Sequence, residues 1–206
     1  EVQTIDTLLR NKQIPVALMS GMAGTEESFK QLSGQSITLL HVATHGFYSP
    51  LTGHYTAQRS FEEQALSRSG LFLSGAAASL NMKKIPEDIE DGILTAKELS
   101  KLDLSNLNLA ILSACQTGLG EIVGDGVFGL QRGFKKAGAQ TLLMSLWKVD
   151  DTATQLLMAE FYKNLVSGQN KRAAFLNAQK YLRSYQNGIY DKPEYWAAFI
   201  MLDGIH

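Results

Sequence analysis

The sequence predicts an α/β fold in which helices cover both faces of a mostly parallel central sheet. Short apolar, β-branched runs alternate along the chain with longer segments of helical period, which is the pattern of strand–helix–strand units. Residues 36–46, 107–115 and 140–149 are almost continuously apolar, as strands buried on both faces are. The chain has 206 residues, 45% of them apolar, and we therefore expect a single domain over 1–206.

The first predicted elements are a possible short strand at 14–18 and a helix at 24–32. Thr25 can cap this helix, and acidic residues fill its first turn, where the positive end of the helix dipole favours them. The apolar strand 36–46 follows. Residues 47–70 interrupt the pattern with proline, glycine and polar clusters, which predicts a long loop, and long loops in compact domains are often functional.

Beyond the loop, residues 71–76 predict a short strand and residues 92–104 predict a helix. Thr95 and Glu98 have the spacing of a capping box, in which each side chain bonds the backbone of the other residue. The apolar strand 107–115 comes next and ends on the only cysteine of the chain.

The last part of the chain continues the alternation of helices and strands. A helix at 124–139 ends at Gly138, a plausible stop because glycine adopts the left-handed conformation of a C-terminal cap. The apolar strand at 140–149 follows. The remaining predicted elements are amphipathic helices at 150–168 and 171–186 and a final strand at 195–204.

Composition and charge narrow the classes of function. The formal net charge of −1 gives no reason to expect nucleic acid or an anionic membrane as a partner. No apolar run reaches the roughly 18 residues that a membrane helix requires, and no signal peptide is visible. The single cysteine cannot form an internal disulfide, so we expect a reducing compartment, the cytoplasm. The first residue is Glu1 rather than Met, and we expect a domain excised from a longer protein.

Two of the apolar strands end in chemically distinctive residues, His45 with Gly46 and Cys115. Because the carboxyl ends of neighbouring parallel strands meet at one edge of a sheet, we expect the imidazole and the thiol to converge. An imidazole can take the proton of a thiol and leave the nucleophilic thiolate. The alternative is that Cys115 is simply a small buried apolar residue, which is the more common role of a lone cysteine.

Two other kinds of site fit the sequence poorly. Residues 118–124 resemble a glycine-rich dinucleotide fingerprint, but the glycine spacing is off by one and no P-loop lysine follows. His41 is expected to be a core histidine on the same strand face as His45. Four scattered histidines and one cysteine do not have the clustered spacing of metal ligands. We therefore expect no metal and no cofactor.

The segment "LLHVATHGF" (39–47), followed by "LAILSACQTGLGE" (109–121), resembles the CHAT domain, a caspase-like cysteine protease family related to separase. The resemblance continues through "SLWKVDD" (145–151) to the end of the chain. It implies a caspase-like three-layer α/β/α sandwich. It implies His45 as general acid or base, Cys115 as nucleophile, and the N–H groups of Gly46 and Cys115 as the oxyanion hole.

The resemblance also implies a protein or peptide substrate and a regulatory sensor or repeat module outside this fragment. Three carboxylates are candidates for binding a basic residue before the scissile bond: Asp125, Asp150 and Asp151. The similarity of "SLWKVDD" to the separase sequence "LWDVTD" favours Asp151. The alternative for Asp150 or Asp151 is to cap the helix that begins there. The alternative for the whole chain is a catalytically latent caspase-like interaction module.

Overall fold

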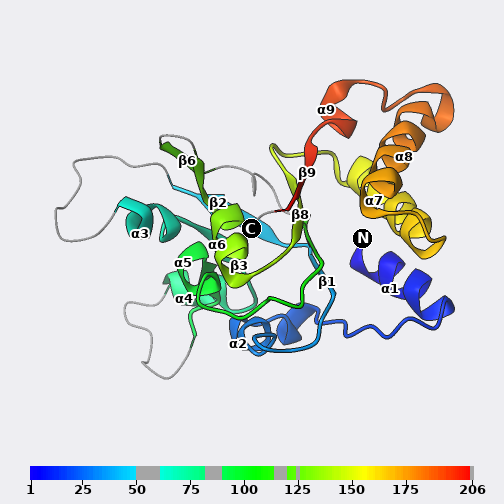
Figure 1. Cartoon of the computed structure of the whole chain (residues 1–206). Helices are drawn as coiled ribbons and strands as arrows, with labels where there is room; N and C mark the ends of the chain where they lie inside the picture. Colours follow the sequence, from blue (N-terminus) through cyan, green and yellow to red (C-terminus); the bar gives the residue numbers. More distant parts are fainter. Residues whose placement is uncertain (50–60, 82–89, 114–119, 124–125, 205–206) are drawn as a thin grey trace. The chain divides into compact units, whose positions relative to one another are not determined.

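The computed structural model describes residues 1–49, 61–81, 90–113, 120–123 and 126–204 (Figure 1). Cys115 and Asp125 lie outside these described residues. The chain divides into two compact units, of which one comprises residues 1–18 and 147–201 and the other residues 19–146 with the C-terminal end. No helix in the described ranges has the length and apolar character needed to cross a membrane.

The central sheet has four described strands in the order β1-β5-β8-β9. Their bounds are Leu39–Val42 for β1, Leu109–Leu112 for β5, Thr141–Ser145 for β8 and Phe199–Asp203 for β9. β1 runs parallel to β5, and β5 runs parallel to β8. Every residue of β5 and β8 is buried, as strands packed on both faces must be. The predicted mostly parallel central sheet is confirmed.

A second, antiparallel sheet has the order β2-β3-β4. Its strands are β2 His45–Tyr48, β3 Ser69–Phe72 and β4 Ile93–Thr95. A separate two-stranded antiparallel sheet pairs β6, Gly120–Val123, with β7, Gly126–Gly129. The prediction of one strand over 36–46 is therefore wrong, because the chain leaves the central sheet after Val42 and enters the second sheet at His45. His41 and His45 consequently do not share a strand face.

Helices of the unit 19–146 are short. Their bounds are η1 Gly21–Ala23, α2 Glu26–Lys30, α3 Phe61–Leu66, α4 Ala76–Asn81, α5 Ala96–Leu99 and α6 Leu130–Ala137. α6 packs closely on α5, since a Cβ atom added at Gly133 would lie 2.8 Å from the Ala96 carbonyl oxygen. Gly138 ends α6 in the left-handed conformation at φ 98°, as predicted.

The unit of residues 1–18 and 147–201 is mainly helical. It contains α1 Val2–Asn11, α7 Asp151–Val166, α8 Lys171–Ser184, η2 Tyr185–Asn187 and α9 Pro193–Trp196. Phe161 and Phe175 pack edge to face between α7 and α8, with ring centroids 6.0 Å apart. The sequence did not predict helix α1.

Several element boundaries differ from the prediction. Residues 14–18 form no strand, and the strand predicted at 71–76 begins earlier, at Ser69. The helix predicted over 92–104 is a strand followed by the short helix α5, although the predicted capping box of Thr95 and Glu98 is present. The helix predicted from 124 begins only at Leu130.

Candidate functional site

The carboxyl ends of β1 and β5 lie side by side. Val42 and Leu112 are Cα partners in the parallel register, and the Ser113 N–H donates to the Val42 carbonyl oxygen at 2.9 Å. His45 follows Val42 by three residues, and Cys115 follows Leu112 by the same number. The strand ends that precede the two predicted catalytic residues are therefore neighbours at one edge of the sheet, whereas the position of Cys115 lies outside the described residues.

His45 is exposed and stands at the start of β2, opposite Phe72 in the antiparallel register. The hydroxyl of Thr44, the preceding residue, donates a hydrogen bond to the Phe72 carbonyl oxygen. The rings of Phe47 and Phe72 also pack with their centroids 4.9 Å apart. These contacts hold the backbone on both sides of His45 against β3.

The ladder between β2 and β3 leaves the Gly46 amide unused. In an antiparallel ladder, hydrogen-bonded and non-hydrogen-bonded pairs alternate. The Ser49 N–H donates to the Arg68 carbonyl oxygen at 2.8 Å, so these two residues form a hydrogen-bonded pair that continues the ladder. Hydrogen-bonded pairs recur every second residue, and His45 with Phe72, four residues back, is therefore also a hydrogen-bonded pair. Gly46 and Leu71 then form a non-hydrogen-bonded pair. Because β2 is at the end of its sheet's order, the Gly46 N–H faces the edge away from β3.

Gly70 allows β2, β3 and β4 to approach closely. A Cβ atom at this position would lie 2.5 Å from the Leu94 carbonyl oxygen and 2.7 Å from the Phe47 ring. Such distances do not occur for real side chains, so the backbone or the Phe47 ring would have to shift. The glycine at 70 therefore helps to place the strand that begins with His45.

The predicted substrate-binding carboxylates differ in their surroundings. Asp150 caps α7, since its Oδ1 accepts a hydrogen bond from the Ala153 N–H at 2.9 Å. This is the capping alternative that the sequence left open. Asp151 is the first residue of α7 and is exposed. Asp125 lies outside the described residues.

The two tryptophans lie outside the strands, and each donates its ring N–H to a backbone carbonyl oxygen. Trp147 lies after β8, is 38% exposed and donates its ring N–H to the Glu194 carbonyl oxygen. Trp196 ends α9 and donates to the Asp191 carbonyl oxygen.

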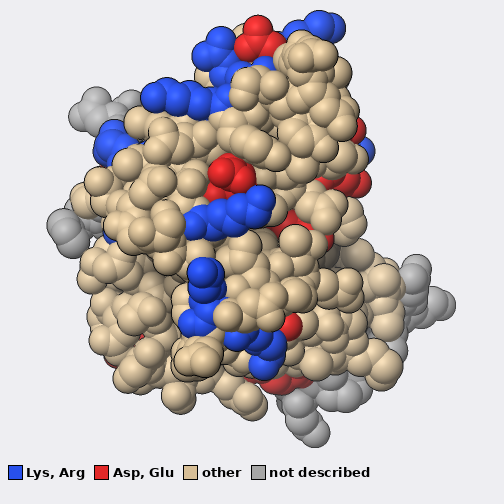
Figure 2. All heavy atoms as spheres, turned by 90° about the vertical axis from the view of Figure 1, so that its right-hand side faces the viewer, with Lys and Arg blue, Asp and Glu red and all other residues tan. Residues whose placement is uncertain are grey.

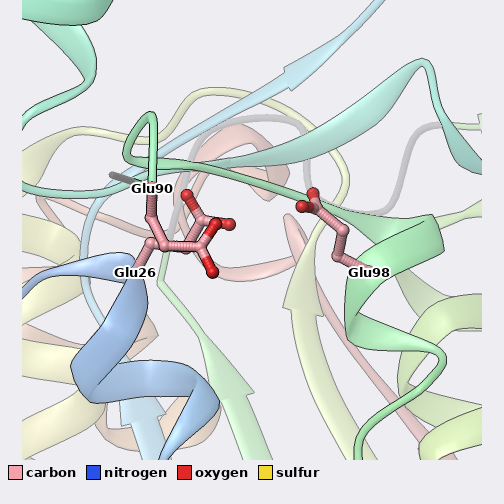
Figure 3. Close-up of side chains that lie close together, drawn as sticks. All are labelled: Glu26, Glu90 and Glu98. Carbon is pink, nitrogen blue, oxygen red and sulfur yellow. The ribbon is translucent and has the colours of Figure 1, made fainter. Parts of the chain in front are cut away.

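A cluster of four charged side chains, Glu26, Lys30, Glu90 and Glu98, was not predicted from the sequence. Figure 3 shows its three glutamates. Lys30 Nζ lies 2.7 Å from Glu26 Oε1, 2.8 Å from Glu90 Oε1 and 3.3 Å from Glu98 Oε1. The second oxygen of Glu26 accepts a hydrogen bond from the Gly92 N–H at 3.0 Å. The cluster thus joins α2 to the segment before β4 and to α5.

Burial and pairing shift the pKa values in this cluster in opposite directions. Burial raises the pKa of Glu26, and this effect outweighs the lowering by Lys30. Burial opposes the charge on Lys30, but hydrogen bonds to Glu26 and Glu90 raise the pKa of Lys30 above its usual value. Burial also opposes ionisation of Glu98, yet hydrogen bonds from Thr95 keep the pKa of Glu98 below its usual value.

The three carboxylates of this cluster are close enough to ligate one cation together. The Lys30 ammonium contacts all three and supplies a positive charge to the cluster itself. We therefore assign the cluster a structural role rather than a role in binding a metal ion. The signals in the sequence are weak: Glu26 and Lys30 have the four-residue spacing of a helical ion pair, and Glu98 belongs to the capping box.

Comparisons with known proteins agree with this fold. A family model described as "CHAT domain" matches residues 1–204. The chain is 34% identical over 110 residues to mouse Tetratricopeptide repeat protein 28, and 32% identical over 114 residues to the human protein of that name. These matches cover 53% and 55% of this chain but only 4% of each relative, so the chain corresponds to a small part of their length.

Proposed function

Because this chain belongs to the CHAT domain family, which is caspase-like, we propose that it is a cysteine endopeptidase with a His45–Cys115 dyad. The match over residues 1–204 confirms the resemblance drawn from the sequence, and the mixed α/β fold with a mostly parallel sheet agrees with a caspase-like fold. The proposed substrate is a protein or peptide.

The observation that carries the proposal is the parallel register of β1 and β5. Val42 and Leu112 are paired, and each proposed catalytic residue follows its strand by three residues. The exposure of His45 supports a role in proton transfer with a bound substrate. The Gly46 N–H, which the β2–β3 ladder does not use, supports an oxyanion role for that amide.

In the proposed mechanism, His45 accepts the thiol proton of Cys115, and the thiolate Sγ attacks the scissile carbonyl carbon. The N–H groups of Gly46 and Cys115 stabilise the oxyanion, an effect of about 2.7–4 kcal/mol for one donor in proteases. His45 then protonates the leaving amine as the carbon–nitrogen bond breaks, and a thioester remains. Water, deprotonated by His45, hydrolyses the thioester and regenerates the thiol.

Asp151 is the preferred candidate for binding a basic side chain before the scissile bond. Its carboxylate is exposed, whereas that of Asp150 bonds the Ala153 N–H. Asp125 remains a second candidate from the sequence. A substrate preference for Arg or Lys would depend on such a charge pair. If Asp151→Ala cleaved peptides with Arg or Lys at the unmodified rate, the preference would need another explanation.

The relatives named for tetratricopeptide repeats support a regulatory repeat module as a partner of this domain in a longer protein. Such a module would control when substrate reaches the dyad. This part of the proposal concerns residues beyond the present chain and is tested by comparing the activity of the domain alone with that of the longer protein.

The dyad is tested with a peptide acyloxymethyl ketone that carries Arg next to the reactive group and labels nucleophilic thiols. We expect labelling of the chain, loss of labelling in Cys115→Ala, and a strong decrease in His45→Ala. His54→Ala, which removes another histidine, is the matched control and should label normally. Equal labelling of His45→Ala and the unmodified chain would indicate an exposed thiol without a base and would favour the latent interaction module.

A further inference from the structure

Helix α8 carries four basic side chains and no acidic one. Lys171 and Arg172 lie in its first turn, and Lys180 and Arg183 lie in its second half. The first turn is unfavourable for cations because the positive end of the helix dipole is there. Lys180 and Arg183 are three residues apart, so their like charges are neighbours on the helix surface. The cations in the first turn therefore reduce the stability of the helix, whereas Arg183 in the last turn suits the negative end of the dipole.

Arg183 also has partners inside the chain. The Arg183 guanidinium pairs with Asp191 at 2.9 Å and lies over the Trp196 ring, 4.7 Å from its centroid. No ion pair of Arg172 or Lys180 is found among the described residues, and both side chains are exposed. Arg172 and Lys180 are therefore exposed cations that no ion pair within the described part of the chain neutralises, and they are available to an anionic partner.

The exposed basic residues share one face of α8 with an apolar side chain. Arg172, Leu176 and Lys180 follow one another at intervals of four residues, which confines them to an arc of about 80° on the helix. Leu176, which lies between the two cations, is 49% exposed. The opposite face is buried and comprises Ala174, Phe175, Ala178 and Leu182. Figure 2, which views the structure from the right-hand side of Figure 1, shows exposed Lys and Arg side chains with Asp and Glu side chains among them.

We propose that the exposed face of α8, formed by Arg172, Leu176, Lys180 and Arg183, binds an acidic segment of a partner protein. Carboxylates of that segment would pair with Arg172 and Lys180, and an apolar side chain between them would cover Leu176. The proposal rests on charge complementarity and does not depend on the dyad.

The mixture of side chains favours an acidic protein segment over other anionic partners. A nucleic acid backbone offers no apolar group to cover an exposed leucine, and the chain as a whole has a formal net charge of −1. A membrane surface binds helices through a broad apolar face. The face of α8 that carries Arg172 and Lys180 has Leu176 as its one exposed large apolar side chain.

The test uses the full 206-residue chain with Cys115→Ala, so that hydrolysis cannot remove the probe. The probe is a fluorescein-labelled peptide in which Glu residues flank a leucine, and its binding is followed by anisotropy at low and high salt. We expect saturable binding that weakens as NaCl rises, because screening shortens the range of the charges. A peptide with Lys in place of Glu should not bind.

Charge reversal locates the binding surface. The double variant Arg172→Glu/Lys180→Glu should weaken binding about tenfold or more. The control Lys12→Glu/Lys101→Glu has the same change in net charge on other exposed positions and should keep the affinity within about twofold. Leu176→Ser should weaken binding of the leucine-containing peptide, but not of a peptide with Ser in place of the leucine. Far-ultraviolet circular dichroism and thermal melting confirm that each variant folds.

Three results would overturn the proposal. The first is absence of binding at peptide concentrations up to about 1 mM, because a Kd above that value would be weaker than ordinary docking affinities. The second is an equal loss of affinity in the α8 variant and its control, which would indicate net charge alone. The third is tighter binding of single-stranded DNA, or of phosphatidylserine-containing vesicles, than of the peptide, with the same dependence on Arg172 and Lys180.

Discussion

Lys30 Nζ lies 2.7 Å from Oε1 of Glu26, a carboxylate whose side chain is only 1% exposed. Two further carboxylates, from Glu90 and Glu98, contact the same ammonium. One cation is thus shared by three carboxyl groups in a partly desolvated site. The same cluster holds the segment that leads into β4, and β4 is in the sheet that carries His45.

Removal of this cation should destabilise the fold. In Lys30→Met the three carboxylates remain without a counter-charge, and we expect a loss of about 2–4 kcal/mol of unfolding free energy. This is somewhat below the effect of breaking a fully buried pair, because a quarter of the Lys30 side chain is exposed. Urea denaturation measures the loss. The control Lys163→Met removes the exposed pair with Glu160 and should cost less than about 1 kcal/mol. Similar losses in the two variants would argue against the role of the cluster.

The two glutamates of the cluster should contribute to stability with opposite dependence on pH. The pKa of Glu26 is raised from its ordinary value of 4.5, so its favourable contribution is present below pH 4.5 and is lost as pH rises through the folded-state value. The pKa of Glu98 is lowered from 4.5, so its contribution is present above pH 4.5 and is lost as pH falls.

Replacement of each glutamate by glutamine should separate these effects. From pH 4 to pH 7, the stability of Glu26→Gln should rise relative to the unmodified chain. In the acidic part of the same titration, the unmodified chain is expected to be more stable than Glu98→Gln at pH 4.5 and above, and this difference in unfolding free energy should shrink as the pH falls below 4.5. Urea midpoints at several pH values provide the measurement. Parallel pH profiles of the two variants would contradict the assignment.

Gly70→Ala should disturb the second sheet. The added methyl group would meet the Leu94 carbonyl oxygen and the Phe47 ring, and we expect a loss of about 1–3 kcal/mol, as for overpacked cores. Gly24→Ala is the matched control, because its nearest contact would be 3.6 Å away. If the two variants melted at the same temperature, Gly70 would not be required for the approach of the strands.

Thr44 should position His45 without contacting the substrate. Thr44→Val removes the hydroxyl that donates to the Phe72 carbonyl oxygen, so we expect labelling of Cys115 by the peptide ketone to slow about tenfold or more. Thr44→Ser should restore the rate, because the serine hydroxyl can donate the same bond. Thr7→Val removes a comparable hydroxyl bond on α1 and serves as the control. A purely structural effect would lower the melting temperature but leave the labelling rate of the folded protein unchanged.

Arg172→Glu should stabilise the isolated chain while it weakens docking at α8. A carboxylate in the first turn of α8 suits the helix dipole, and we expect a gain of about 0.3–1 kcal/mol in unfolding free energy. Thermal melting at low salt measures it. Arg172→Gln should give a melting temperature between those of the unmodified chain and Arg172→Glu. A lower melting temperature in either variant would mean that Arg172 makes a stabilising contact.

The predictions from sequence were most accurate where the signal is local. The fully apolar strands β5 and β8, the caps Thr25 and Thr95 and the stop at Gly138 were correctly located. Each depends on residues within a few positions of one another. The catalytic roles of His45 and Cys115 stay predictions, although the pairing of Val42 with Leu112 agrees with their convergence.

Local patterns of residues were enough to predict that buried strands alternate with capped helices and that an imidazole and a thiol follow two of those strands. The folded structure was needed to show that the apolar run 36–46 divides between two sheets, because apolar residues suit either sheet and the bond from Thr44 to Phe72 joins residues 28 positions apart. It alone decided that Lys30 meets three carboxylates and that the basic face of α8 stays exposed. Contacts between residues far apart in the chain depend on how elements pack, and no local pattern of residues records that.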